Sequence, residues 1–98
     1  MPQVRWTSHA LRDVQKLSRF LNQKNREASK KAVAEIRKYA RLLETTPDIG
    51  VPDEDDEYSG YRDLIIPFGA SGYVLRYFLD NGQPIIVAVK HQKEAGFY

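Results

Sequence analysis

Apolar residues recur at steps of three and four in the first half of the chain and alternate in its last third. The first spacing predicts a helix over about residues 8–22, with Thr7 or Ser8 as its N-cap. The apolar positions of this helix are Leu11, Val14, Leu17 and Leu21. Asn25 is placed to cap a second helix, which ends at Thr46-Pro47 because proline disfavours a helical residue before it. Its apolar positions are Ala28, Ala32, Ile36, Tyr39 or Ala40, and Leu43.

Three short apolar runs between residues 61 and 91, separated by glycine- and asparagine-rich breaks, predict an antiparallel meander. Asn81-Gly82 fits a two-residue type I′ turn, in which both central residues have positive φ. Residues 3–6 alternate and predict a first strand, whereas residues 47–60 are predicted to be loop. The fold class is therefore α+β, in the order β-α-α-β-β-β. A helical hairpin is expected on one face of a small, mainly antiparallel, four-stranded sheet.

Both faces of the predicted sheet are substantially apolar. In the third strand Tyr73, Leu75, Tyr77 and Leu79 share one face, and Val74, Arg76 and Phe78 share the other. In the last strand Ile85, Val87 and Val89 are expected on one face, and Ile86, Ala88 and Lys90 on the other. Since the helices cover only one face, the second is expected to form an open apolar surface for a partner.

Composition narrows the class of protein. The chain has 98 residues, enough for one domain, and no cysteine, which excludes disulfides and thiol catalysis. No apolar run is long enough to cross a membrane, and no secretory signal is evident, so we expect a cytoplasmic protein. The acidic run at residues 53–57 lacks the ligand spacing of a calcium loop, and we expect no metal site.

Charge is distributed unevenly. Residues 1–41 hold eleven lysines and arginines against three acidic residues, although the whole chain carries only +2. A basic first half suits an acidic protein or a nucleic acid as partner, and it equally describes two ordinary solvated helix faces.

Four local sequences, read in order, carry a resemblance that covers nearly the whole chain. They are Thr46 to Pro52 after the second helix, Gly60-Tyr61-Arg62, Ser71 to Tyr77, and the run that ends in Val89-Lys90-His91. Together they resemble the RelE/ParE superfamily of type II toxin–antitoxin toxins. The resemblance implies one toxin domain over residues 1–98, an intracellular growth inhibitor without a cofactor that a cognate, ParD-like antitoxin holds inactive.

The RelE branch of this superfamily cuts messenger RNA on the ribosome without a metal. Such chemistry needs a base, an acid and cations that stabilise the charge on the phosphorane. The residues of this chain that would supply these groups are Arg62, Arg76, His91 and Tyr98. Val74 and Gln92, however, stand where RelE-like toxins have functional arginines. Each lost cation costs about 10²–10³ in rate, so two losses argue against an efficient nuclease of the RelE type.

The ParE branch lacks these catalytic groups and poisons DNA gyrase by trapping its cleaved DNA complex. Ile66-Pro67-Phe68, Val74 and Lys90-His91 resemble this branch. The favoured interpretation is a gyrase-directed toxin that is not itself an enzyme, with a ribosome-dependent mRNA endonuclease as the alternative. We expect the polar C-terminal segment to contact the target, and Arg62 and Arg76 to contact the antitoxin. The target-binding residues expected in that segment are Lys90, His91, Lys93, Phe97 and Tyr98.

Overall fold

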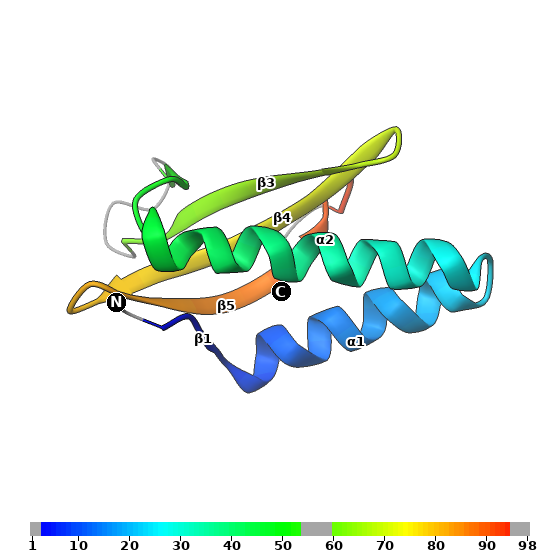
Figure 1. The fold of residues 1–98 in the computed structure, drawn as a ribbon, viewed down its shortest axis with the longest axis horizontal. Helices are drawn as coiled ribbons and strands as arrows, with labels where there is room; N and C mark the ends of the chain where they lie inside the picture. Colours follow the sequence, from blue (N-terminus) through cyan, green and yellow to red (C-terminus); the bar gives the residue numbers. More distant parts are fainter. Residues whose placement is uncertain (1–2, 54–59, 95–98) are drawn as a thin grey trace.

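The computed structural model describes residues 3–53 and 60–94, in which a helical hairpin lies against one face of a five-stranded sheet (Figure 1). The elements are β1 (Arg5–Trp6), α1 (Ser8–Asn22), α2 (Arg26–Thr45), β2 (Val51–Pro52), β3 (Arg62–Phe68), β4 (Ser71–Asp80) and β5 (Gln83–His91). The strand order is β1-β5-β4-β3-β2, with β1 parallel to β5 and the other neighbours antiparallel. The α+β class and the helical hairpin are confirmed.

Side-chain caps fix where both helices begin, as the sequence predicted. The Thr7 Oγ1 atom accepts a hydrogen bond from the Ala10 N–H at 3.2 Å. Asn25 Oδ1 accepts from the N–H groups of Glu27 and Ala28, at 3.0 and 3.2 Å. Each cap satisfies N–H groups that have no partner within the first turn of a helix.

The turn between β4 and β5 is also as predicted. Asn81 has a φ of 50° and Gly82 a φ of 83°, so both central residues occupy the left-handed region that a type I′ turn requires.

The core lies between the hairpin and the inner face of the sheet. Its most buried side chains include Ile36 and Leu43 from α2, and Leu75, Tyr77 and Ile86 from the strands. Ala10, which the apolar spacing did not include, is fully buried at the start of α1. Leu11, predicted to face the core, is instead 51% exposed. The small side chain of Ala10 lets α1 approach the sheet, and Leu11 is thereby turned toward solvent.

The prediction of the two faces of β5 was wrong because of a β-bulge. Arg76 pairs with Ala88 but the next residue, Tyr77, pairs with Ile86, so Val87 is skipped. A bulge shifts the alternation of side chains by one position. Ile86 and Val89 therefore both join the core, whereas Ile85, Ala88 and Lys90 share the outer face with their partners in β4.

The outer face of the sheet is not the open apolar surface that the alternation predicted. Val74 and Ile85 are each only 7% exposed, and Ala88 is fully buried. Part of the cover comes from Tyr61, whose ring centroid lies 6.2 Å from that of Phe78 and 5.4 Å from Arg76 Cζ.

The region predicted as loop contributes a fifth strand. Val51 and Pro52 pair with Asp63 and Arg62, which places β2 at the edge of the sheet beside β3. Two residues without apolar alternation give no strand signal in the sequence, and this pairing depends on contacts distant in the chain.

Candidate functional site

The candidate residues lie at opposite ends of β4. Arg62 pairs with Tyr77 near the end of β4, whereas His91 pairs with Tyr73 near its beginning. Tyr73 and Tyr77 are four positions apart in the strand, a distance of about 13 Å along the sheet. We call these two ends the Tyr77 end and the Tyr73 end.

The Tyr77 end is built around one buried hydroxyl. The Tyr77 hydroxyl donates to the Pro47 carbonyl oxygen at 2.8 Å and accepts from the Gly50 N–H at 2.8 Å. A Cβ on Gly50 would lie 2.6 Å from the Tyr77 ring, so only glycine fits there. Burial raises the pKa of Tyr77 above its ordinary value, and the Gly50 hydrogen bond partly offsets this effect.

Arg62 bonds to the same segment of backbone. Its Nη1 donates to the carbonyl oxygens of Gly50, at 2.8 Å, and Asp48, at 3.1 Å. The guanidinium therefore holds the segment that leads from α2 into β2. Bonds of this kind position the backbone of the chain itself.

Arg76 lies on the outer face and forms an ion-pair network. Its Nε and Nη2 donate to the Asp63 carboxylate at 2.9 and 3.1 Å, and Nη2 also donates to Asp53 Oδ2 at 2.9 Å. The Arg76 side chain is 16% exposed. The bidentate pair with Asp63 ties β4 to β3, and the bond to Asp53 ties β4 to the residue that follows β2.

At the Tyr73 end, both ring nitrogens of His91 are engaged. The Lys93 N–H donates to Nδ1 at 3.2 Å, and Nε2 lies 3.0 Å from Ser71 Oγ. Because Nδ1 accepts, the proton of the neutral ring sits on Nε2, which donates to the Ser71 hydroxyl. The ring also meets Tyr73 edge-on, with centroids 5.6 Å apart.

An apolar groove of about 590 Å³ opens beside this histidine. We call it the apolar groove. It is lined by side chains of α1, by the β3–β4 hairpin, by the end of β5 and by the residues that follow it. The lining includes Leu17, Phe20 and Leu21, then Phe68 and Tyr73, and finally His91 and Lys93. Phe20 is 56% exposed, an unusual position for a large aromatic side chain.

Two of the residues predicted to bind the target, His91 and Lys93, line this groove. Lys90 lies on the outer face beside Val74, and its Nζ donates to the Glu94 carbonyl oxygen at 2.8 Å. Phe97 and Tyr98 lie outside the described residues.

The residues of the nuclease alternative do not converge among the described part of the chain. Arg76 shares the outer face with Ala88, whereas His91 shares the inner face with Tyr73. Arg62 lies at the other end of the sheet from His91. Tyr98, the fourth member of the set, is not described.

Sequence reasoning missed Phe20 and Phe68. Phe20 lies outside the apolar positions of α1. This position could have identified Phe20 from the sequence, since a phenylalanine on a solvated helix face is uncommon. Phe20, Phe68 and His91 line one groove only through tertiary packing, which has no local signature in the sequence.

Across residues 3–53 and 60–94, no three potential metal-ligating side chains lie together. None of the described helices is both long enough and apolar enough to cross a membrane.

Comparison with known proteins places this fold in a family. Residues 4–96 match the model of the ParE toxins of the type II toxin–antitoxin system parDE. The chain belongs to the ParE toxin family. It is also 31% identical over 94 residues to Toxin RelE3 of Caulobacter vibrioides, covering 96% of this chain and 98% of that protein. A ParE-type toxin of this kind is part of a type II toxin–antitoxin module.

Two solved structures share the ParE-type fold. The chromosomal ParDE toxin–antitoxin system from P. aeruginosa superimposes with a TM-score of 0.75 at 18% identity, covering 93% of this chain and 96% of that one. A conserved hypothetical protein from Helicobacter pylori, HP0894, gives a TM-score of 0.55 at 16% identity and covers 98% and 100% of the two chains.

Proposed function

We propose that this ParE-family toxin stops growth by binding DNA gyrase and trapping the enzyme on cleaved DNA, and that it has no nuclease activity of its own. One observation carries the proposal: Arg76 and His91 lie on opposite faces of the sheet, and Arg62 lies at its other end. General acid–base chemistry requires its groups within hydrogen-bond reach of one reacting phosphate. These three side chains do not meet that condition.

The bonding of each side chain supports the same conclusion. Arg62 donates to two backbone carbonyl oxygens, and Arg76 to two carboxylates. In His91, Nδ1 accepts a backbone N–H and is not available to take a proton from a substrate hydroxyl.

The apolar groove is the surface that we assign to the target. It combines an exposed aromatic, Phe20, with a cation, Lys93, at the rim. Buried aromatic anchors surrounded by a polar rim account for most of the binding energy in protein interfaces. A groove of this composition therefore suits an apolar side chain of a protein partner.

The antitoxin is proposed to bind elsewhere, along the open edge of β3. β2 pairs only with Arg62 and Asp63, and no other described strand lies beside the rest of β3 on that side. The Asp53 N–H donates to the Tyr61 carbonyl oxygen on this side, so by alternation the backbone groups of Ile65 point outward. Ile65 is 47% exposed. An extended antitoxin segment is expected to add a strand here.

The predicted antitoxin contacts, Arg62 and Arg76, lie next to this edge and stay a prediction. Amide hydrogen exchange tests the antitoxin part of the proposal. The Ile65 amide is expected to exchange much more slowly in the toxin–antitoxin complex than in the free toxin. Unchanged exchange at Ile65 in a saturated complex would contradict a strand added at β3.

The gyrase proposal is tested with purified gyrase and relaxed plasmid. Added toxin is expected to inhibit supercoiling and to increase linear plasmid after denaturation, and the cognate antitoxin is expected to reverse both effects. Phe20→Ser should weaken the inhibition at least tenfold. Leu11→Ser is the matched control, because Leu11 is similarly exposed on α1 but lies about 180° around the helix from Phe20.

The alternative, a metal-independent mRNA endonuclease, is tested in a translating extract. Codon-positioned cuts that disappear in His91→Ala, together with normal supercoiling at stoichiometric toxin, would replace the gyrase proposal with this one.

A further inference from the structure

A second groove runs along the seam between α1 and α2, on the side of the hairpin that faces away from the sheet. Two adjoining hollows, of about 660 and 480 Å³, share Ser18, Val33 and Arg37 and so form one continuous depression. We call it the helical groove. Its floor is tight, because the Ser29 hydroxyl donates to the Ser18 carbonyl oxygen and the two hydroxyls are 3.0 Å apart.

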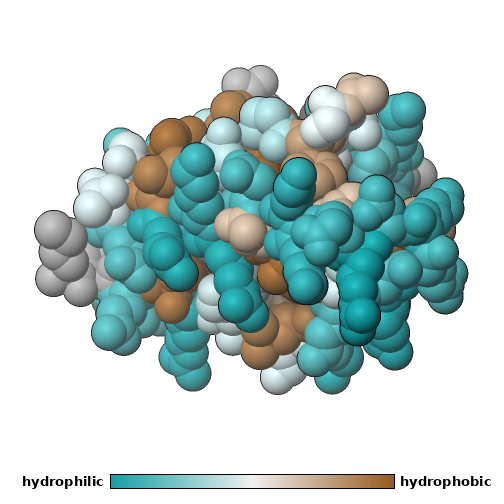
Figure 2. All heavy atoms as spheres, turned by 45° about the vertical axis from the view of Figure 1, so that its right-hand side comes forward, coloured by the Kyte–Doolittle hydropathy of each residue, from teal (hydrophilic) through white to brown (hydrophobic). Residues whose placement is uncertain are grey.

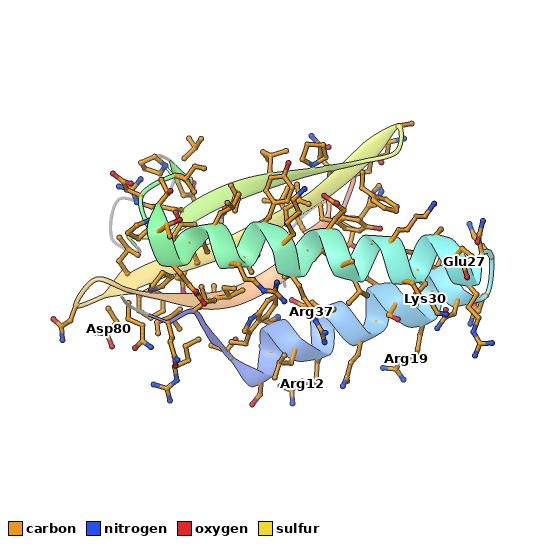
Figure 3. All side chains as sticks on the ribbon, in the orientation of Figure 1. Arg12, Arg19, Glu27, Lys30, Arg37 and Asp80 are labelled. Atoms are coloured by element: carbon orange, nitrogen blue, oxygen red, sulfur yellow. The ribbon has the colours of Figure 1, made fainter. Side chains whose placement is uncertain are left out.

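The rims of the helical groove carry charge of one sign. Six of the residues that line it are lysines or arginines, and no acidic residue lines it. These cations are Arg19, Arg26, Lys30, Arg37, Lys38 and Arg41. All six are exposed. Figure 3 shows Arg37 lying over the seam between the helices, with Arg19 on α1.

These cations are not used to hold the fold together. The ion pairs among residues 3–53 and 60–94 involve His9 and Arg76, and none includes a cation of this groove. The nearby carboxylate of Asp13 is directed to the sheet, where it accepts the Val89 N–H at 3.0 Å. Figure 2 shows how extensively hydrophilic side chains cover the face that it displays.

From this arrangement we infer that the helical groove binds the phosphate backbone of duplex DNA. Arg26, Lys30, Arg37 and Arg41 are separated by four, seven and four residues, which keeps them on one side of α2. They span about 22 Å at roughly 1.5 Å per residue. That length corresponds to about six base pairs at roughly 3.4 Å per phosphate on one strand.

The lining distinguishes duplex DNA from other acidic partners. It contains no aromatic residue, whereas single-stranded nucleic acid is held by stacking on aromatic rings and protein partners are held by aromatic anchors. Cations without base-reading geometry imply binding that is independent of DNA sequence.

DNA binding at this groove is separate from the gyrase proposal, since it is measured without gyrase. The full-length toxin is titrated into a fluorescent duplex of random sequence at several salt concentrations. Expected is a dissociation constant of about 10⁻⁴ to 10⁻⁶ M that weakens on the order of 10²-fold between 50 and 200 mM salt.

Charge-matched variants locate the contact. Arg26→Gln with Arg37→Gln should weaken binding at least tenfold and reduce the slope of log affinity against log salt by about 1.8, roughly 0.9 per lost phosphate contact. Arg5→Gln with Arg12→Gln removes the same charge outside the groove and should leave the slope unchanged. Lys30→Gln with Arg41→Gln provides a second groove pair if the first variant has a lowered melting temperature.

Equal losses in the groove and control variants would overturn the proposal, because they would indicate only an effect of net charge. Tighter binding to a single strand, to duplex RNA or to a polyglutamate peptide than to duplex DNA at the same salt would overturn it as well.

Discussion

The two ends of β4 use their side chains in opposite ways. At the Tyr77 end, polar groups meet in bonded sets: the Tyr77 hydroxyl bridges Pro47 and Gly50, and Arg76 joins Asp53 and Asp63. At the Tyr73 end, apolar groups line an open groove, and Phe20 is 56% exposed.

This difference separates conspicuous residues that are bonded within the fold from those that the proposed function assigns to binding. An arginine in a strand attracts attention as a candidate catalytic group, yet Arg62 and Arg76 hold the β2 segment in place. A phenylalanine on a helix attracts less attention, yet the Phe20 ring is more than half exposed. Substitutions at the Tyr77 end should therefore change stability, and substitutions at the Tyr73 end should change function.

Tyr77→Phe is expected to have the largest effect on stability. It leaves the buried Gly50 N–H and the Pro47 carbonyl without their partner, at a cost of about 3 kcal/mol in the free energy of unfolding. Urea denaturation measures the loss, and Tyr39→Phe is the control, since Tyr39 is only partly buried. A loss below about 0.5 kcal/mol would show that the hydroxyl does not anchor this segment.

Arg76→Met should destabilise the fold by about 1–3 kcal/mol, because two partly buried carboxylates lose their shared cation. Salt partly screens the repulsion that remains between the Asp53 and Asp63 carboxylates in the variant. The loss of stability should therefore be smaller at high salt. Arg5→Met, at an exposed position, is the control. Equal stability of the two variants in urea would contradict the role given to the network.

Alkaline pH is expected to destabilise the protein through Tyr73 and Tyr77. Burial raises the pKa of both hydroxyls in the folded state. The folded protein therefore retains protons that the unfolded chain releases above about pH 10, so stability present below that pH is lost as pH rises through the folded values. Urea midpoints measured from pH 8 upward should fall from about pH 10, and less steeply in Tyr77→Phe. A midpoint independent of pH over that range would contradict the assignment.

Phe20→Ser should have the smallest effect on stability, under about 1 kcal/mol, because the ring is largely exposed and its cation–π contact, with Lys24 Nζ at 4.7 Å from the centroid, is weak at an exposed site. Thermal unfolding compares it with Leu11→Ser. A large loss of stability would make Phe20 a core residue and remove the contrast between the two ends.

Local signals allowed most of the fold to be predicted. The Thr7 and Asn25 caps, the helical periods and the Asn81-Gly82 turn each act over a few residues, and each is present. The strand β2 and the bulge at Val87 have no such signal, since both depend on pairing with a neighbouring strand.

The candidate site could be predicted only in part, for the same reason. His91 and Lys93 are target-binding residues predicted from the sequence, and both line the apolar groove. Phe20 and Phe68 were not predicted, because they are 48 positions apart in the chain and only the packing of α1 against the end of the β3–β4 hairpin brings them to one surface. Whether Arg62 is catalytic or structural likewise depends on the Gly50 carbonyl, which is distant in sequence.

Growth arrest on induced expression tests the central claim most directly, because it reports on the binding surface in the cell. Wild-type toxin and Leu11→Ser should arrest growth at the same induction level, Phe20→Ser should fail to arrest it at equal protein abundance, and His91→Gln should keep most of the activity. Arrest by Phe20→Ser together with complete loss of arrest in His91→Gln would contradict the account, since toxicity would then depend on a chemical group at His91 and not on the exposed Phe20 ring.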